Sequence, residues 1–134
     1  GHPKIWNTLQ KIYEQNGIEP VQDFRQVMQR ADLYVNDCSS TMYEFLVTGR
    51  PVVIMNAPWF RRNVNFGVRF WSYTDIGPQV ERPQDLVGAV ERVLDDAEPW
   101  REARERAVRE LYPNLGCASQ KAAEALEQFL FWGK

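Results

Sequence analysis

Apolar residues recur along this chain at two spacings, which together predict helices alternating with short strands. A helical spacing indicates a first helix from Pro3 to Asn16, which Gly17 can end in a left-handed conformation. Asp23 is predicted to cap a second helix, with Gln26 completing a capping box. Four residues of this second region should face inward: Phe24, Val27, Met28 and Ala31. The segment from Ile18 to Val21 is expected to be short and extended. Short apolar runs predict strands at Leu33 to Asn36 and Val52 to Met55, and a further strand is expected near Ile76 to Val80.

The second half of the chain is predicted to be largely helical. Pro83 and Pro99 can each occupy the first position of a helix, and the later of these helices should run to about Leu111. A last helix is expected from Ser119 to about Phe131. Its apolar side chains should be buried: Ala122, Ala123, Leu126, Phe129 and Leu130. The stretch from Asn56 to Asp75, rich in aromatic residues and arginine, fits a long loop with a short helix.

A cluster of small hydroxyl residues separates the first buried strand from the helix that follows it. Ser39, Ser40 and Thr41 open that helix, where free backbone N–H groups and the positive end of the helix dipole favour a phosphate. The helix ends near Gly49, and Pro51 begins the next strand. Strand, turn, helix and strand form one βαβ unit. The pattern therefore predicts an α/β fold, a Rossmann-like parallel sheet with flanking helices, that binds a phosphate at this turn.

Length and composition narrow the class of protein. With 134 residues, 44% of them hydrophobic, the chain fits a single domain spanning residues 1–134. A net charge of -2 with interspersed acids and bases gives no basic stripe, so nucleic acid is not an expected partner. No apolar stretch is long enough to span a bilayer, and no signal peptide is recognised. Cys38 and Cys117 show no metal-ligand spacing, which favours a reducing, cytoplasmic compartment.

Several motifs resemble those of one family. The run from Asp37 to Leu46 reads Asp-Cys-Ser-Ser-Thr-Met-Tyr-Glu-Phe-Leu, and Gly49-Arg50-Pro51-Val52 follows it. Together they resemble the Asp-Tyr-Ser-Ser…Asp-Phe…Gly-Lys-Pro signature of the CDP-glycerol glycerophosphotransferase family, the teichoic-acid polymerases. Further similar motifs are His2-Pro3, Gly77-Pro78 and Asn114-Leu115-Gly116-Cys117-Ala118-Ser119. The resemblance covers nearly the whole chain.

The resemblance implies a fold and roles for individual residues. The family has a two-lobed GT-B architecture, so this chain would be the C-terminal, donor-binding lobe, with the acceptor lobe and strands upstream of His2 missing. Ser39 and Ser40 would bind the phosphates of a CDP- or UDP-activated donor, helped by the N–H of Thr41. Glu44 would accept hydrogen bonds from the ribose hydroxyls. His2 would be the catalytic histidine that contacts the phosphate or assists the leaving group.

Other residues are expected near this site, and the chain departs from the family pattern at two places. The candidate neighbours are Asp37, Cys38, Arg61 and Arg62. Cys38 stands where the family has tyrosine, and a thiol at a helix start should be unusually reactive. A phosphatase loop of the Cys-x5-Arg type is excluded, because Glu44 occupies the arginine position. The turn from Asn114 to Gly116 lacks the acid and the lysine of the family motif.

The residues leave other interpretations open. Ser39 to Thr41 could serve only as a helix cap, Glu44 could only offset the helix dipole, and Gly1-His2 could remain from cloning. UDP-N-acetylglucosamine 2-epimerases carry Asp-Ser-Gly-Gly…Glu at the same spacing as Asp37 to Glu44. An epimerase-like enzyme is therefore one alternative, and a non-catalytic interaction module is another.

The resemblance also implies a chemistry and a setting. The sequence contains no Asp-x-Asp motif, so neither a metal nor a cofactor is expected, in keeping with GT-B enzymes. The expected function is that of a donor lobe in cell-surface polymer synthesis, inactive without its acceptor lobe. The full enzyme would work in the cytoplasm or at the inner face of the cell membrane. Its partners would be the activated donor and the missing lobe, and an unpaired sheet edge would favour self-association.

Overall fold

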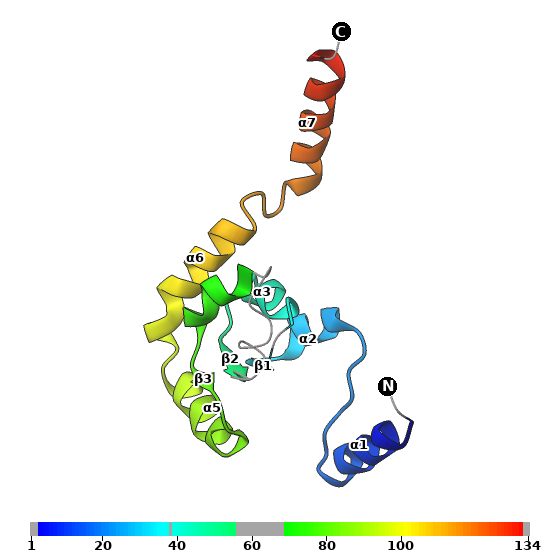
Figure 1. The fold of residues 1–134 in the computed structure, drawn as a ribbon, viewed down its shortest axis with the longest axis vertical. Helices are drawn as coiled ribbons and strands as arrows, with labels where there is room; N and C mark the ends of the chain where they lie inside the picture. The colour runs from blue at the N-terminus through cyan, green and yellow to red at the C-terminus, as the bar shows by residue number, and fades with distance from the viewer. Residues whose placement is uncertain (1–2, 38, 56–68, 133–134) are drawn as a thin grey trace. The chain divides into compact units, whose positions relative to one another are not determined.

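The computed structural model describes residues 3–37, 39–55 and 69–132. Contacts between Cα atoms divide the chain into two compact units, residues 1–31 and residues 32–134, and each is described by itself. In the first unit an irregular segment joins α1 (Pro3–Gln15) to α2 (Phe24–Arg30) (Figure 1). That the whole chain works as one donor-binding domain stays a prediction.

The two helices of the first unit follow the sequence pattern. Gly17 has a φ angle of +66°, which confirms the left-handed stop after α1. Asp23 caps α2, and its carboxylate accepts a hydrogen bond of 3.0 Å from the N–H of Arg25. The four residues predicted to face inward are half-buried, and the remaining side chains of α2 are exposed. Arg30 donates two hydrogen bonds, of 2.9 and 2.6 Å, to the carboxylate of Glu19, which ties the end of α2 to the segment before it.

A parallel sheet organises residues 32–134 (Figure 1). Among the described strands, β2 (Val52–Met55) lies between β1 (Tyr34–Asn36) and β3 (Gln79–Val80). The helix α3 (Thr41–Leu46) connects β1 to β2. The structure thus confirms an α/β fold with a Rossmann-like parallel sheet. The other helical elements are η1 (Arg69–Ile76), η2 (Pro83–Asp85), α5 (Leu86–Asp95), η3 (Glu98–Trp100), α6 (Arg101–Leu111) and α7 (Ala118–Trp132).

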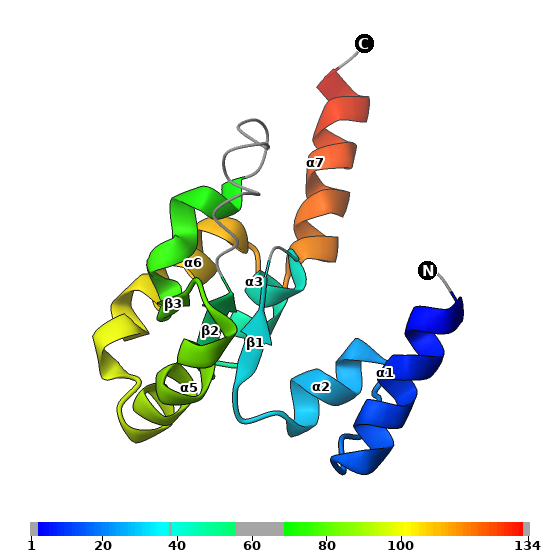
Figure 2. The ribbon, with the colours of Figure 1, turned by 60° about the horizontal axis from the view of Figure 1, so that its bottom comes forward.

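Helices cover both faces of the sheet (Figure 2). On one face α3 packs against β1, where the ring centroids of Tyr34 and Phe45 lie 5.2 Å apart, and α6 packs against α3. On the other face Val53 of β2 packs with Ala89 and Val93 of α5 in one buried cluster. Successive residues of a strand point to opposite faces, so a strand covered on both faces must be apolar throughout. This explains the continuous apolar run of β2.

A glycine controls how β3 approaches β2. Gly77 is buried, and a Cβ atom at this position would overlap the carbonyl oxygen of Val52. The next residue, Pro78, accepts a hydrogen bond of 2.9 Å from the N–H of Ile54. Because Gly77 has no side chain, the two backbones can come close enough for this bond to form. The Gly77-Pro78 motif is therefore a packing requirement of the sheet.

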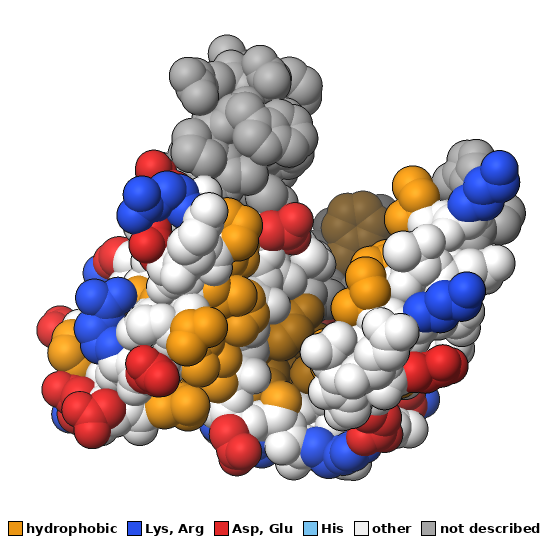
Figure 3. Space-filling model, turned by 90° about the horizontal axis from the view of Figure 1, so that it is seen from below, with side chains coloured by type: hydrophobic (Ala, Val, Ile, Leu, Met, Phe, Trp, Pro, Cys, Tyr) orange, Lys and Arg blue, Asp and Glu red, His pale blue; other side chains and the backbone are white. Residues whose placement is uncertain are grey.

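The helices of the second half lie where the sequence predicts them, but their burial differs. Residues Pro83 to Asp95 and Glu98 to Leu111 are helical, and η1 is the short helix expected in the aromatic stretch. In α7, Leu126, Phe129 and Leu130 are 62%, 78% and 67% exposed, and Ala122 and Ala123 are exposed as well. The prediction that α7 buries this face was wrong, because no described residue covers it. Figure 3, viewed from the side of α5, shows other apolar side chains exposed among charged ones.

Candidate functional site

Hydrogen bonds fix the shape of the predicted phosphate turn, which follows the carboxyl end of β1. The side-chain oxygen of Asn36 accepts a hydrogen bond of 2.9 Å from the N–H of Ser39. The side-chain nitrogen of Asn36 donates to the hydroxyl of Tyr34 at 3.2 Å. The Tyr34 hydroxyl lies 3.0 Å from Thr41 Oγ1, which lies 2.8 Å from Ser39 Oγ. These four side chains, called the hydroxyl network below, join β1 to the first turn of α3.

Backbone N–H groups of this turn already have acceptors within the chain. The N–H of Thr41 donates to Ser39 Oγ at 3.3 Å. The N–H groups of Met42 and Tyr43 donate to the carbonyls of Ser39 and Ser40, at 3.2 and 3.0 Å. The Ser40 side chain makes no cap hydrogen bond and is exposed. The sequence suggested that these N–H groups would be free, but in the structure each of them has an acceptor. An anion at this turn would therefore have to replace the Ser39 hydroxyl as the acceptor for the N–H of Thr41.

Glu44 lies one turn further along α3, with its side chain exposed. Burial raises the pKa of Tyr112, and the negative charge of Glu44 raises this pKa further, which places the two side chains near each other. The turn after α6, which contains Tyr112, lines a cavity of about 310 Å³. Asn114, Leu115 and Gly116 line this cavity, and Glu44 does not.

One comparison decides the family of the chain. The family model described as CDP-glycerol:poly(glycerophosphate) glycerophosphotransferase matches residues 1–127. The chain belongs to this family. The match confirms the resemblance that was recognised from the motifs, and it covers nearly the whole sequence. No curated protein and no solved structure matches the chain.

Membership of the glycerophosphotransferase family does not by itself assign the site residues. Asp37 is exposed immediately after β1, in the turn that contains the hydroxyl network. Four predicted site residues lie outside the described residues: His2, Cys38, Arg61 and Arg62. Their roles stay predictions, as do those of the described residues Ser39, Ser40, Thr41 and Glu44.

The sequence reasoning missed two members of the hydroxyl network, Tyr34 and Asn36. Both lie in the strand predicted from Leu33 to Asn36, where they were counted only as part of a buried segment. Residues two apart in a strand point to the same face. A tyrosine and an asparagine on one face at the carboxyl end of a strand were therefore a usable signal.

A further tyrosine of α3 lies away from this turn. The hydroxyl of Tyr43 is buried and has no hydrogen-bond partner among the residues that the structure describes. Burial, and to a lesser degree the charge of Tyr73, raises the pKa of Tyr43. The two rings meet edge to face with centroids 6.0 Å apart, and the Tyr73 hydroxyl donates to Glu110 Oε2 at 2.8 Å. Tyr43 thus serves the packing of α3 against η1.

Among the described residues, no group of three or more His, Cys, Asp or Glu side chains could hold a metal ion. None of the described helices combines the length and the apolar character needed to cross a bilayer.

Proposed function

We propose that residues 32–134 bind the donor nucleotide of a GT-B glycerophosphotransferase, with the donor diphosphate at the hydroxyl network. The observation that carries the proposal is a continuous chain of hydrogen bonds from Asn36 to Ser39. In open parallel sheets, ligands bind outside the carboxyl ends of the strands, which is where this network stands. The description of the matching family supports CDP-glycerol as the donor.

The Asn36 amide sets the direction of donation in the network. Its oxygen accepts from the N–H of Ser39, so its nitrogen faces Tyr34 and donates to the phenol oxygen. Tyr34 can then donate its own proton to Thr41 Oγ1, and Thr41 can donate to Ser39 Oγ. Each bond polarises the next one. Ser39 is left with a proton that can point out of the network, which makes it a strengthened donor toward an anion.

A phosphate oxygen would take two places in this turn. It would accept a hydrogen bond from the Ser39 hydroxyl, and it would replace Ser39 Oγ as the acceptor for the N–H of Thr41. The present bond between these two residues, 3.3 Å, is long for an N–H donor, whereas bonds to a charged oxygen are short and strong. Ser40 could add a further hydroxyl donor. The exchange therefore favours the anion.

Glu44 and the turn after α6 would hold the nucleoside. The exposed carboxylate of Glu44 can accept hydrogen bonds from two ribose hydroxyls. Tyr112 lies near Glu44 and contributes to the wall of the cavity of about 310 Å³, which would take the base. The phosphates and the nucleoside would thus lie along consecutive turns of α3.

The chemistry that this arrangement would assist is phosphoryl transfer. Moving glycerophosphate from CDP-glycerol to an acceptor hydroxyl breaks the bond between the donor phosphates and releases CMP. Negative charge grows on the CMP phosphate, so catalysis depends on positioning and on donors aimed at that charge. The hydroxyl network would supply such donors, and His2 keeps its proposed role at the leaving group. An acceptor with its general base belongs to another lobe in this proposal, so the chain alone should bind the donor without transferring it.

Two tyrosine substitutions test the proposal with a matched control. Tyr34→Phe keeps the ring against Phe45 but interrupts the network, and it should weaken CDP-glycerol binding by about 0.5–1.5 kcal/mol in calorimetric titrations. Ser39→Ala removes the donor itself and should cost about 1.5–3 kcal/mol. Tyr43→Phe removes a hydroxyl outside the network and should leave the affinity unchanged.

The same titrations separate the alternatives. If CDP-glycerol binds folded Tyr34→Phe and Ser39→Ala proteins as tightly as the wild type, the diphosphate does not lie at this turn. Tighter binding of UDP-N-acetylglucosamine than of CDP-glycerol would favour the epimerase-like alternative. Glu44→Gln should reduce the preference for a ribonucleotide over its 2′-deoxy analogue. An unchanged preference would assign Glu44 a structural role.

A further inference from the structure

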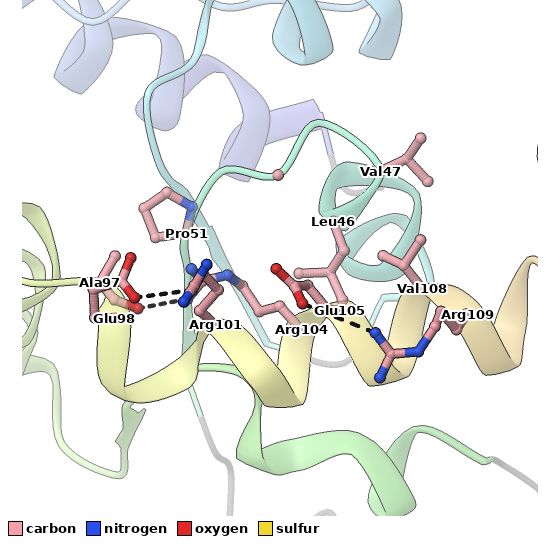
Figure 4. A pocket seen from close by; sticks show the side chains of 11 residues that line it. Leu46, Val47, Pro51, Ala97, Glu98, Arg101, Arg104, Glu105, Val108 and Arg109 are labelled. Carbon is pink, nitrogen blue, oxygen red and sulfur yellow. Dashed lines mark hydrogen bonds and ion pairs between the residues drawn. The ribbon is translucent and has the colours of Figure 1, made fainter.

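A cavity of about 540 Å³ lies between the end of α3 and one face of α6 (Figure 4). Leu46 at the end of α3 and Val47 just after it line the cavity, together with Pro51 just before β2 and Val108 of α6. Pro51 precedes β2, whereas the hydroxyl network follows β1, and these strands are parallel. The cavity therefore lies at the amino end of the strands, opposite the proposed nucleotide site.

Arg104 of α6 places a buried positive charge in the lining of the cavity. It is only 7% exposed, and its Nη1 donates a hydrogen bond of 3.1 Å to the carbonyl of Ala97. No carboxylate of the described residues forms an ion pair with it. Burial lowers the pKa of Arg104, and the more distant charges of Glu98 and Glu105 offset this only in part. A buried guanidinium without a paired anion is costly, and an anion placed on it would remove that cost.

The other charges of the lining are already paired. Arg101 binds Glu98 at 2.8 Å, and Arg109 approaches Glu105 at 3.9 Å (Figure 4). The lining thus holds three arginines against two glutamates, an excess of one positive charge that belongs to Arg104. A ligand with one negative charge would balance it, whereas a nucleoside diphosphate would bring more negative charge than Arg104 alone can balance.

We propose that this cavity binds a small monocarboxylate, with the carboxylate on Arg104 and an apolar body against Leu46, Val47 and Val108. The volume falls within the range of about 300–1,000 Å³ typical of small-molecule sites. A guanidinium offers a carboxylate a pair of parallel hydrogen bonds, and Arg104 uses one nitrogen for Ala97. The apolar part of the lining would take a short hydrocarbon chain. This site is independent of the proposed nucleotide site.

Octanoate is a suitable probe, and calorimetric titration into the full 134-residue chain is the measurement. Octanoate should bind, and 1-octanol, which has the same chain without the charge, should bind at least about tenfold more weakly. Arg104→Met fills similar space without charge and should lower the octanoate affinity at least about tenfold. It should also keep or raise the urea midpoint, because it removes an unpaired buried charge. Arg92→Met, at an exposed arginine of α5 outside the cavity, should bind octanoate as the wild type does.

A spectroscopic measurement on the wild type does not depend on any variant folding. Saturating octanoate should shift the ¹⁵N–¹H resonance of Arg104 Nε and leave that of Arg92 in place. Equal affinity for octanoate and octanol would overturn the proposal. So would equal octanoate affinity in the wild type and a folded Arg104→Met protein, no binding of octanoate at all, or an unmoved Arg104 resonance.

Discussion

Replacing Gly77 by alanine tests whether the sheet is built as described. Alanine at this position would place Cβ against backbone, since the carbonyl oxygen of Val52 would be overlapped and the carbonyl carbon would lie only 3.0 Å away. A flexible side chain could turn aside, but a strand backbone held on both edges cannot. We therefore expect β3 to be pushed away from β2, with loss of the hydrogen bond between Ile54 and Pro78.

The magnitude follows from these two effects. Forcing an extra carbon into a packed interior typically costs about 1–3 kcal/mol. Losing one internal hydrogen bond adds about 0.5–1.5 kcal/mol. The free energy of unfolding should thus fall by about 1.5–4.5 kcal/mol, a large share of the roughly 5–15 kcal/mol that stabilises a typical domain. Urea denaturation followed by the NMR signals of the β2 amides measures this change for the sheet itself.

Gly88 provides the matched control for Gly77→Ala. It lies within α5, and a Cβ atom there would meet nothing within 4 Å. Gly88→Ala should therefore raise the free energy of unfolding by about 0.5–1 kcal/mol, because glycine is a poor helix former. If Gly88→Ala shows this gain while Gly77→Ala unfolds at the same urea midpoint as the wild type, the described approach of β3 to β2 is wrong.

Three further expectations concern other parts of the chain. Tyr43→Phe should raise the free energy of unfolding by about 1 kcal/mol, because the buried hydroxyl has no hydrogen-bond partner in the described part of the chain, and a loss of stability would show that it has one. The hydrogen bond and the charge of the Arg30 guanidinium hold the pKa of Glu19 below its ordinary value. The pair therefore stabilises the folded chain at pH values above the ordinary pKa of a glutamate, and this stabilisation is lost as the pH falls through the lowered pKa. An NMR titration of the Glu19 carboxyl should show a lowered midpoint in the wild type and the ordinary midpoint in Arg30→Gln. Asp23→Ala should destabilise α2 by about 0.5–2 kcal/mol, seen as reduced helical Cα shifts, whereas unchanged shifts would exclude the cap.

The parts of the fold that the sequence predicted are those with a local cause. The run from Val52 to Met55 is apolar throughout because helices cover both faces of β2, so its composition alone identified a buried strand. Gly17 and Gly49, with φ angles of +66° and +75°, mark the ends of α1 and of the turn after α3 because few other residues adopt that conformation. These signals depend on neighbouring residues only.

The parts that it missed depend on distant residues. The clash that makes glycine necessary at position 77 comes from Val52, which no local pattern reveals. The periodicity of α7 correctly indicates which side chains share a face, but it cannot show whether anything packs on that face. At the candidate site, the hydroxyl residues of the turn were predicted from their position before a helix. Tyr34 and Asn36 were missed because their role depends on where the strand directs their side chains.

The exposed face of α7 has a consequence for how this chain should unfold. An isolated helix of 15 residues is only marginally stable in water, and α7 has neither an acidic residue in its first turn nor a basic one in its last. With Phe129 and Leu130 exposed, little tertiary packing adds to that stability. The amides of α7 should therefore exchange with solvent far sooner than those of β2, through local opening rather than global unfolding. On denaturation, helix content would then begin to fall before the sheet unfolds. A single two-state transition would not describe both events.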